Sequence, residues 1–380
     1  MKRRCVEIEP RSAGTSLRSM AVFQSPYVLT GKSPKIIYVA KLSFRPKGAG
    51  FFGVPYKLSN GLTRAGCNVI NFSDDDVARA SSIFRNRKTG AKGANRKLVA
   101  LAKEIGPDII ILGHADTIRP STLEELRSVC PNTRLAQWSV DPLFLDEDRE
   151  RVERKIDRVD WTFSSTGGEY LQALGRNGHA VAFLPNPVDP SIERARNFTK
   201  SSHELPFDLF YAAGYSEIPR FHGGIQTTSG RIVERIVAEC PTLRGLFPGA
   251  REGSPHAFGA AFEQALASAA MGLNISRRND VPLYSSDRFA QLAGSGILTF
   301  LDRATGYPEI FGEDEFAFYS TEDEMIDKIR YFHAHDDERR SVARKGWQAY
   351  VDVFDTTKVA SYMVGVIMGE IDPAKHVWHR

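Results

Sequence analysis

Cysteine is scarce in this chain of 380 residues. The four cysteines, Cys5, Cys67, Cys130 and Cys240, show no paired spacing, so the sequence indicates neither a disulfide framework nor a zinc site. Thiols that stay reduced fit a cytoplasmic protein. Long apolar runs are also missing, because no stretch reaches the roughly 18 uninterrupted apolar residues of a membrane span. The apolar run at residues 20–23 is too short for the core of a signal peptide.

One nucleotide-binding motif is absent as well, because the full P-loop pattern is not present. The glycine-rich stretch at 47–53 has the spacing G-x-G-x-x-G, with Gly48, Gly50 and Gly53 between the first expected strand and a helix. A net charge of +4 is too small to indicate a nucleic-acid partner. The hydrophobic content of 42% and the charged content of 25% are typical of a globular protein. The length allows two α/β domains.

From Lys35 onward, short β-rich runs alternate with amphipathic helical patterns. The alternation predicts parallel strands with helices on both faces, which is a doubly wound α/β domain. Expected strands lie at 36–40, 68–72, 108–112, 135–139, 161–164 and 180–184, then at 209–212, 243–247, 273–275, 297–300 and 316–319. The proline-rich segment at 185–190 separates the two series.

We therefore predict two Rossmann-like domains, at 34–195 and 205–353, after a mobile tail at 1–33. A helix at Thr356–Met368, within the segment 354–380, is expected to cross back to the first domain. A cleft between two such domains is the expected place for a small-molecule site.

The segment from Gly272 to Phe300 predicts an anion site. Arg277 and Arg278 follow a short strand, and ligands of open α/β sheets bind beyond the carboxyl ends of the strands. Guanidinium groups hold phosphate through paired, charge-assisted hydrogen bonds. The alternative is an ordinary strand–helix–strand unit with solvated arginines.

A helix start follows the two arginines. Ser285, Ser286 and Asp287 are good N-caps for a helix that runs through Arg288, and the free amides of its first turn would add donors for an anion. Further along the second series, a strand runs into Gly214, which permits close backbone approach to a ligand. Arg220 follows within reach of a phosphate.

A basic run lies in the first domain. Six basic residues occupy a stretch of thirteen: Arg85, Arg87, Lys88, Lys92, Arg96 and Lys97. Such a run is usually a solvated loop. Otherwise it contacts an anionic membrane surface or a phosphorylated acceptor, since each basic residue near anionic lipid contributes about 1 kcal/mol.

Several motifs carry a family resemblance. They are the Leu-Asn-Ile-x-Arg-Arg-Asn-Asp segment at 273–280, the Arg-Phe-x-x-Leu-Ala-x-x-Gly helix at 288–296, Gly-Tyr-Pro-Glu-Ile-Phe at 306–311, Asp-Pro at 141–142, Asp-Trp-Thr-Phe at 160–163 and Leu-Pro-Asn-Pro-Val-Asp at 184–189. The sequence resembles GT-B glycosyltransferases of the spore-maturation (CgeB-like) group, which are of the glycosyltransferase group 1 type. The resemblance covers about residues 35–365.

This resemblance implies a metal-independent transferase without a cofactor, which moves a sugar from a nucleotide-sugar donor to an acceptor. The second domain would hold the nucleotide and the first the acceptor. Positive side chains and helix dipoles would neutralise the departing diphosphate, and the residues expected to bind the donor are Gly214, Tyr215, Arg220, Arg277, Arg278, Ser285, Ser286, Arg288 and Gln291. Pro248 and Gly249 occupy the place where such enzymes hold the base, although a plain Pro-Gly turn fits them equally well.

On the acceptor side, the resemblance implies a loop containing Gly48, Gly50, Phe51 and Gly53 at the edge of the cleft. An inverting transferase also needs a general base. His114, Asp116 and Asp141 follow two strands of the first domain and are the candidates. Alternatively, His114 only caps a helix or orders a loop.

One departure from the family concerns the paired glutamates E-x7-E of the group-one enzymes. The matching positions here are Leu283 and Gln291. Our leading hypothesis is a glycosyltransferase of cell-envelope glycan synthesis, acting on lipopolysaccharide or capsule, cytoplasmic or peripheral at the inner face of the membrane. An inactive nucleotide- or sugar-binding protein on the same scaffold and a nucleotide-sugar epimerase are the alternatives. The donor, the acceptor and the stereochemical outcome stay open.

Overall fold

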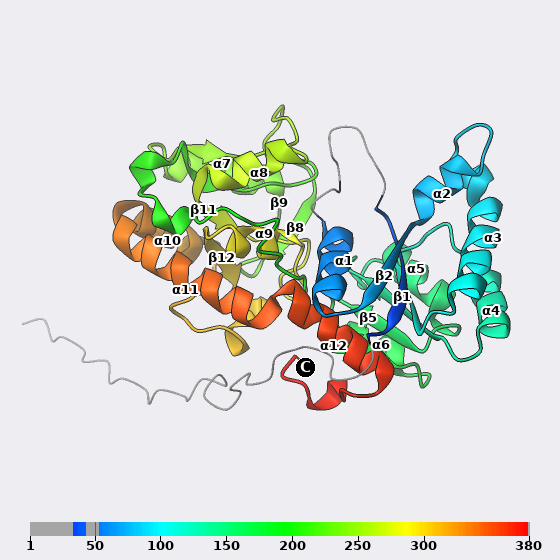
Figure 1. The fold of residues 1–380 in the computed structure, drawn as a ribbon. Helices are drawn as coiled ribbons and strands as arrows, with labels where there is room; N and C mark the ends of the chain where they lie inside the picture. The colour runs from blue at the N-terminus through cyan, green and yellow to red at the C-terminus, as the bar shows by residue number, and fades with distance from the viewer. Residues whose placement is uncertain (1–32, 43–49, 51–52, 379–380) are drawn as a thin grey trace, which may run out of the picture.

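The computed structural model describes residues 33–42, 50 and 53–378. Two α/β lobes lie side by side, each built around one parallel sheet (Figure 1). The tail expected at 1–33 and the loop residues Gly48 and Phe51 lie outside the described residues, apart from residue 33.

The N-terminal lobe contains a six-stranded sheet in the order β2-β1-β3-β4-β5-β6, and all neighbouring strands are parallel. Its strands are β1 (Lys35–Ala40), β2 (Asn68–Ser73), β3 (Ile109–Gly113), β4 (Arg134–Ser139), β5 (Trp161–Ser164) and β6 (Val181–Phe183). Its helices are α1 (Val54–Arg64), α2 (Asp74–Ala80), α3 (Arg87–Ile105), α4 (Pro120–Val129), α5 (Asp146–Ile156) and α6 (Gly168–Gly175). Every residue of β3 is buried, as expected for a central parallel strand covered on both faces.

The C-terminal lobe contains a five-stranded parallel sheet in the order β10-β7-β11-β12-β13. Its strands are β7 (Phe207–Phe210), β10 (Gly245–Leu246), β11 (Ala269–Leu273), β12 (Leu298–Asp302) and β13 (Ala317–Tyr319). A separate antiparallel hairpin consists of β8 (Pro219–His222) and β9 (Ile225–Thr228). The helices are α7 (Ser229–Glu239), α8 (Ala260–Ala267), α9 (Arg288–Gly294), α10 (Glu322–Ala334) and α11 (Asp336–Phe354).

The expected α/β class and the GT-B arrangement of two parallel-sheet lobes are confirmed. Two local expectations were wrong, and one element was not anticipated. The strand expected at 273–275 is β11, which ends at Leu273, and the β8–β9 hairpin was not anticipated. The basic run is not a loop, because α3 begins at Arg87, where the side chain of Asn86 accepts a hydrogen bond from the Lys88 amide at 2.8 Å.

The crossing helix α12 (Thr356–Met368) is present and packs against α1 of the N-terminal lobe (Figure 1). Thr356 Oγ1 donates to the carbonyl of Lys57 at 2.6 Å. One continuous cluster of buried side chains runs from Ile36 of β1 through Met363 of α12 to Phe289 of α9. The two lobes therefore share a core. Among the described residues, no helix has the length and apolarity to cross a bilayer.

The α1–α12 contact predicts the effect of one substitution. A Cβ at Gly61 would lie 2.2 Å from the carbonyl oxygen of Thr356, so we expect Gly61→Ala to destabilise the chain by about 1–3 kcal/mol through overpacking. The exposed Thr63 on the same helix is the control, and Thr63→Ala is expected to change stability by no more than about 0.5 kcal/mol. Urea denaturation measures both. Equal free energies of unfolding for the two variants would show that α1 and α12 can move apart without loss of stability.

Candidate functional site

The strand order of each sheet predicts where a ligand binds. Taken along the chain, each sheet has the order 2-1-3-4-5, with extra strand β6 beyond it in the first. Ligands of such sheets bind where the order reverses, beyond the carboxyl ends of the first and third strands. In the C-terminal lobe these strands are β7 and β11. The chain leaves β7 through Ala212, Ala213 and Gly214, and it leaves β11 through Asn274 to Arg277.

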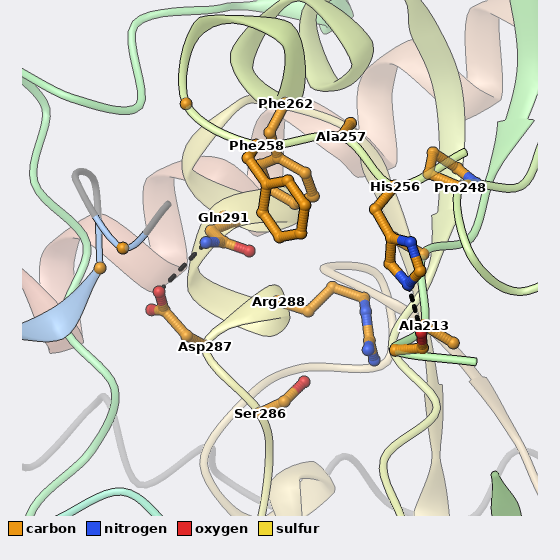
Figure 2. Close-up of a pocket in the computed structure, with 15 residues that line it drawn as sticks. Ala213, Pro248, His256, Ala257, Phe258, Phe262, Ser286, Asp287, Arg288 and Gln291 are labelled. Carbon is orange, nitrogen blue, oxygen red and sulfur yellow. Dashed lines mark hydrogen bonds between the residues drawn. The ribbon is translucent and has the colours of Figure 1, made fainter. Parts of the chain in front are cut away.

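A cavity of about 390 Å³ lies at this point (Figure 2). Phe258 and Phe262 form an apolar wall, while Arg288 and Gln291 project from α9 on the other side. The ring of His256 hydrogen-bonds the carbonyl of Gly214. The remaining lining comes from Gly50, Gly53, Ala212, Ala213, Pro248, Ala257, Gly259, Ser286 and Asp287. The cavity therefore draws on both lobes, because Gly50 and Gly53 precede α1.

Arg288 brings a positive charge to the cavity. Its Nη1 donates to the carbonyl of Ile275 at 3.1 Å, and its Cζ lies 5.5 Å from the centre of the Tyr211 ring. Within the described residues it forms no ion pair with a carboxylate. Burial lowers the pKa of Arg288 to about 10. Burial thus disfavours this charge, and no carboxylate among the described residues is paired with it.

Arg220 is a second cation without a carboxylate partner among the described residues. It is only 6% exposed, and its Nε donates to Ser229 Oγ at 2.9 Å. Ser229 Oγ lies 3.3 Å from the hydroxyl of Tyr211, whose ring is under Arg288. The positive charge of Arg220 also disfavours protonated Arg288. Since an unpaired buried charge is costly, two such neighbours indicate a site for an external anion.

Buried polar groups nearby support the same interpretation. Both side-chain polar atoms of Asn274, Nδ2 of Asn279 and Oγ of Ser286 have no hydrogen-bond partner within the described part of the chain. Buried polar groups are normally satisfied, and exceptions mark places where another molecule supplies the partner. All three residues lie between the end of β11 and the start of α9, in the segment that leads into Arg288.

The other expected donor residues lie in different settings. Arg277 is exposed, but Arg278 is already paired, because its guanidinium holds both oxygens of Asp280 at 2.6 and 2.7 Å. Ser285 is buried behind the cavity, where its carbonyl accepts from Asn186 Nδ2 at 2.9 Å. Tyr215 is exposed beside His256, with 5.5 Å between the ring centres.

The backbone conformation at position 249 and its close packing require a glycine. Gly249 has φ = 64°, and a Cβ would lie 2.3 Å from the carbonyl of Ala213. A side chain at this position would push the loop away from the end of β7. Pro248 lines the cavity directly, whereas Gly249 acts by allowing this close packing.

The three expected general-base candidates are gathered in one polar cluster of the N-terminal lobe. His114 Nδ1 lies 3.3 Å from Asp141 Oδ2. Arg151 binds Asp141 directly and lies 3.5 Å from Asp116. Burial lowers the pKa of His114, which favours the neutral imidazole. His114 also has φ = 58°, an unusual left-handed backbone for a residue with a side chain.

Tyr284 connects this cluster to the arginines of the C-terminal lobe. Its ring packs edge-on against Phe144 of the N-terminal lobe, with 4.9 Å between the centres. Burial raises the pKa of Tyr284 to about 12, opposed by the charges of Arg220, Arg277 and Arg288 and reinforced by that of Asp141. Tyr284 therefore lies within electrostatic reach of both groups, at a contact between the lobes. His114, Asp116 and Asp141 themselves do not line the cavity that contains Arg288.

A buried ionic network fixes the base of α9. Lys57 of α1 lies 2.6 Å from Glu193 Oε1 and 2.9 Å from Asp287 Oδ1. Asp287 Oδ2 in turn accepts from Gln291 Nε2 at 3.1 Å. Asp287 was expected to cap the helix, but its carboxylate makes no such bond and holds Lys57 across the lobe boundary instead.

Two carboxylates compete for this one lysine. Burial alone would lower the pKa of Lys57, but Asp287 and Glu193 outweigh it and raise that pKa. Burial and the negative charge of Asp287 raise the pKa of Glu193 to about 7, against the opposing effect of Lys57. A negative charge on Glu193 is therefore costly in the folded chain.

The sequence analysis did not anticipate Lys57, Glu193, His256, Phe258 or Phe262. His256 and Phe258 lie on the segment between β10 and α8, which has no periodic pattern. Lys57 has the spacing of an ordinary helical residue, and its partners are far away in the sequence. A buried lysine inside the otherwise apolar face of α1 was the available signal.

Comparison with known proteins supports this architecture. Residues 230–364 match the family described as glycosyl transferase-like. No curated protein matches the chain at the level of sequence. HepE from Anabaena, solved with UDP-glucose, is similar in structure with a TM-score of 0.57 and 13% identity over 88% of this chain and 100% of that chain.

Two further solved structures are similar. An α-glucosyltransferase, solved with UDP and a DNA 13-mer containing an HMU base, has a TM-score of 0.60 and 13% identity over 88% of this chain and 99% of its own. Sucrose-phosphate synthase from Thermosynechococcus elongatus has a TM-score of 0.55 and 11% identity over 88% and 98%. At these identities the likeness establishes the fold. The chain has the GT-B fold, and its C-terminal region matches the glycosyl transferase-like family, whereas the narrower spore-maturation subtype stays a prediction.

The raised pKa of Glu193 predicts a dependence of stability on pH. The folded chain binds this proton more tightly than the unfolded chain, whose carboxyl has an ordinary value of 4.5, so stability falls as the pH rises from there to about 7. Relative to Glu193→Gln, the wild type should lose about 2–3 kcal/mol across this window.

Urea denaturation at several pH values measures the difference. Glu104→Gln, at an exposed position near the end of α3, is the control and should show a constant difference from the wild type. A constant difference for Glu193→Gln as well would contradict the assignment.

Proposed function

We propose that this GT-B chain, whose C-terminal region is glycosyl transferase-like, moves a sugar from a nucleotide diphosphate sugar to an acceptor bound across the cleft. The observation that carries the proposal is the pair Arg220 and Arg288. Both are cations without a carboxylate partner in the described chain. Arg288 lines the cavity at the switch point of the C-terminal sheet, and Arg220 is linked to it through Ser229 and Tyr211. A diphosphate has the charge and the oxygen geometry that two guanidinium groups match.

The cavity offers a place for the remainder of the donor. Phe258 and Phe262 provide an apolar wall for a nucleobase, and Pro248 also lines the cavity. Gln291 and Ser286 offer hydrogen-bonding groups for ribose or sugar hydroxyls. Because HepE and the α-glucosyltransferase were solved with UDP or UDP-glucose, uridine diphosphate donors are the first to test.

The arginines would act mainly on the leaving group. Breaking the sugar–phosphate bond increases negative charge on the departing diphosphate, and fixed cations in a partly buried site stabilise that charge as it develops. Arg288 and Arg220 are held by Ile275 and Ser229, so little reorganisation is needed during the reaction. We assign them this role, with Arg277 at the exposed edge.

For an inverting reaction, His114 is the best placed of the three base candidates. With its proton on Nδ1, directed at Asp141, Nε2 retains a lone pair that can accept the acceptor proton. The carboxylate of Asp141 is shared with Arg151, and that of Asp116 faces the same arginine. Asp141 is then a positioning residue for His114.

Surface charge on α3 is the basis for the proposed acceptor class. Exposed basic residues on α3, among them Lys88, Lys92 and Arg96, favour an anionic acceptor. Cell-envelope glycans such as lipopolysaccharide or capsule precursors carry phosphate or acidic sugars and fit this charge. We therefore propose such a glycan as the acceptor.

A specific observation supports a second candidate, a binding protein without transferase activity. Gln291 stands where the group-one enzymes have a glutamate, and the nearby Asp287 carboxylate is occupied by Lys57 and Gln291. If this carboxylate cannot serve the sugar, the cavity still binds a nucleotide. Transfer or hydrolysis of a bound donor distinguishes the two candidates.

Nucleotide affinity tests the donor site. We expect Arg288→Ala to weaken UDP binding by about tenfold to a hundredfold, since a charge-assisted contact to phosphate contributes about 1.5–3 kcal/mol. Arg278→Ala is the matched control and should change affinity little, because that guanidinium is already occupied by Asp280. Calorimetry with UDP, GDP, ADP and CMP measures both. Equal affinities in the two variants would remove Arg288 from the site.

Turnover tests the base. With a sugar donor built on the nucleotide that calorimetry identifies, His114→Gln should keep the donor affinity of the wild type while nucleotide release falls by about a hundredfold or more. His179→Gln, at a histidine that faces Asp157 at 3.3 Å on a different part of the lobe, is the control. Unchanged turnover in His114→Gln would assign the base to another group.

A further inference from the structure

The connection between α2 and α3 exposes two adjacent large apolar side chains. Ile83 is 98% exposed and Phe84 is 83% exposed, more than any other large hydrophobic side chain among the described residues. A single exposed apolar residue is common on protein surfaces, but a neighbouring pair without protein cover indicates a partner. We call residues 81–88 the α2–α3 tip. Figure 1 shows this connection protruding at the outer edge of the N-terminal lobe.

The tip is held in place by close packing beneath it. A Cβ at Gly90 of α3 would lie 1.7 Å from the carbonyl oxygen of Ala78, and one at Gly93 would lie 2.5 Å from Ser81 Cβ. The two helices therefore approach backbone to backbone. Arg85 adopts φ = 48°, a left-handed conformation that is unfavourable for arginine and that turns the chain from the tip into α3.

Uncompensated positive charge surrounds the apolar pair. Lys88, Lys92 and Arg96 recur every four residues along α3, so they share one face, and all three are exposed. Neither these residues nor Arg85 form an ion pair with any described residue. By contrast, Arg79 of α2 and Arg87 at the start of α3 are paired with Asp75 at 3.5 and 3.2 Å.

We propose that the α2–α3 tip binds an anionic lipid bilayer, with Ile83 and Phe84 inserted among the lipid chains and the α3 lysines against the headgroup phosphates. An apolar pair flanked by lysines and arginines has the two-part chemistry of interfacial membrane anchors. Single-stranded nucleic acid is a poorer match, because it calls for a basic groove with several stacking aromatic rings. The tip is a protrusion with one aromatic ring.

The two helices that flank the tip are hydrogen-bonded to the loop that carries His114. Asp74 at the start of α2 accepts from Thr117 Oγ1 at 2.9 Å, and Asn95 of α3 donates to the carbonyl of Thr117 at 2.7 Å. Both bonds are buried, and Thr117 is three residues beyond His114. If the proposed function holds, a bilayer-bound tip would keep the acceptor side of the cleft at the membrane, where a lipid-linked acceptor is found.

Vesicle flotation of the full chain tests the anchor without requiring any donor or turnover. We expect the wild type to float with phosphatidylcholine vesicles that contain phosphatidylglycerol and to remain behind with phosphatidylcholine alone. Ile83→Ser/Phe84→Ser should weaken binding by about a hundredfold, as expected for losing two buried apolar side chains. Ile225→Ser, at an exposed apolar residue of β9, is the matched apolar control.

The charge contribution has its own pair of variants. Lys88→Glu/Lys92→Glu should abolish binding to the anionic vesicles, whereas Arg231→Glu/Arg251→Glu, with the same change of net charge on exposed residues of the C-terminal lobe, should retain it. Unchanged flotation of both tip variants, or no flotation of the wild type with anionic vesicles, would overturn the proposal. The proposal would also be overturned if the protein bound a DNA oligonucleotide through the tip and did not bind the vesicles.

Discussion

The buried contact of Lys57 with Glu193 and Asp287 is the constraint on which the arrangement of the two lobes depends. Lys57 comes from α1, Glu193 from the segment that joins the lobes, and Asp287 from the start of α9. Since a buried charge is tolerated only when its partners are in place, the lysine fixes three parts of the chain at once. Directly after Asp287 comes Arg288, so the network also sets where the positive charge enters the cavity.

A contrast between paired and unpaired arginines defines the candidate donor site. Arg278 and Arg288 lie near each other in the sequence. Asp280 neutralises Arg278, whereas no described carboxylate neutralises Arg288. Keeping Arg220 and Arg288 together costs folding free energy, which a bound anion would return. Functional sites commonly retain such locally unfavourable groups because they act on the ligand. The unsatisfied side chain of Asn274 fits the same pattern.

The sequence predicts most of the fold because its β-rich runs and amphipathic helices have clear periods. It predicts less where tertiary contacts decide. Gly90 and Gly93 weaken the helical pattern at the start of α3, but close packing against α2 makes them favourable there. The identity of the site residues was partly readable, since Arg288 follows recognisable N-cap residues. Sequence spacing does not predict that Arg278 pairs with Asp280 or that Lys57 contacts Asp287. Both contacts depend on the three-dimensional arrangement of the chain.

The structure of the chain bound to UDP tests the central claim most directly. The account predicts that the diphosphate lies within hydrogen-bonding distance of the Arg288 and Arg220 guanidinium groups, with the base against Phe258 and Phe262. It also predicts that Lys57 keeps both carboxylate partners in the complex. A nucleotide whose phosphates contact neither arginine, or one bound away from the cavity, would contradict the assignment of the unpaired arginines to the donor.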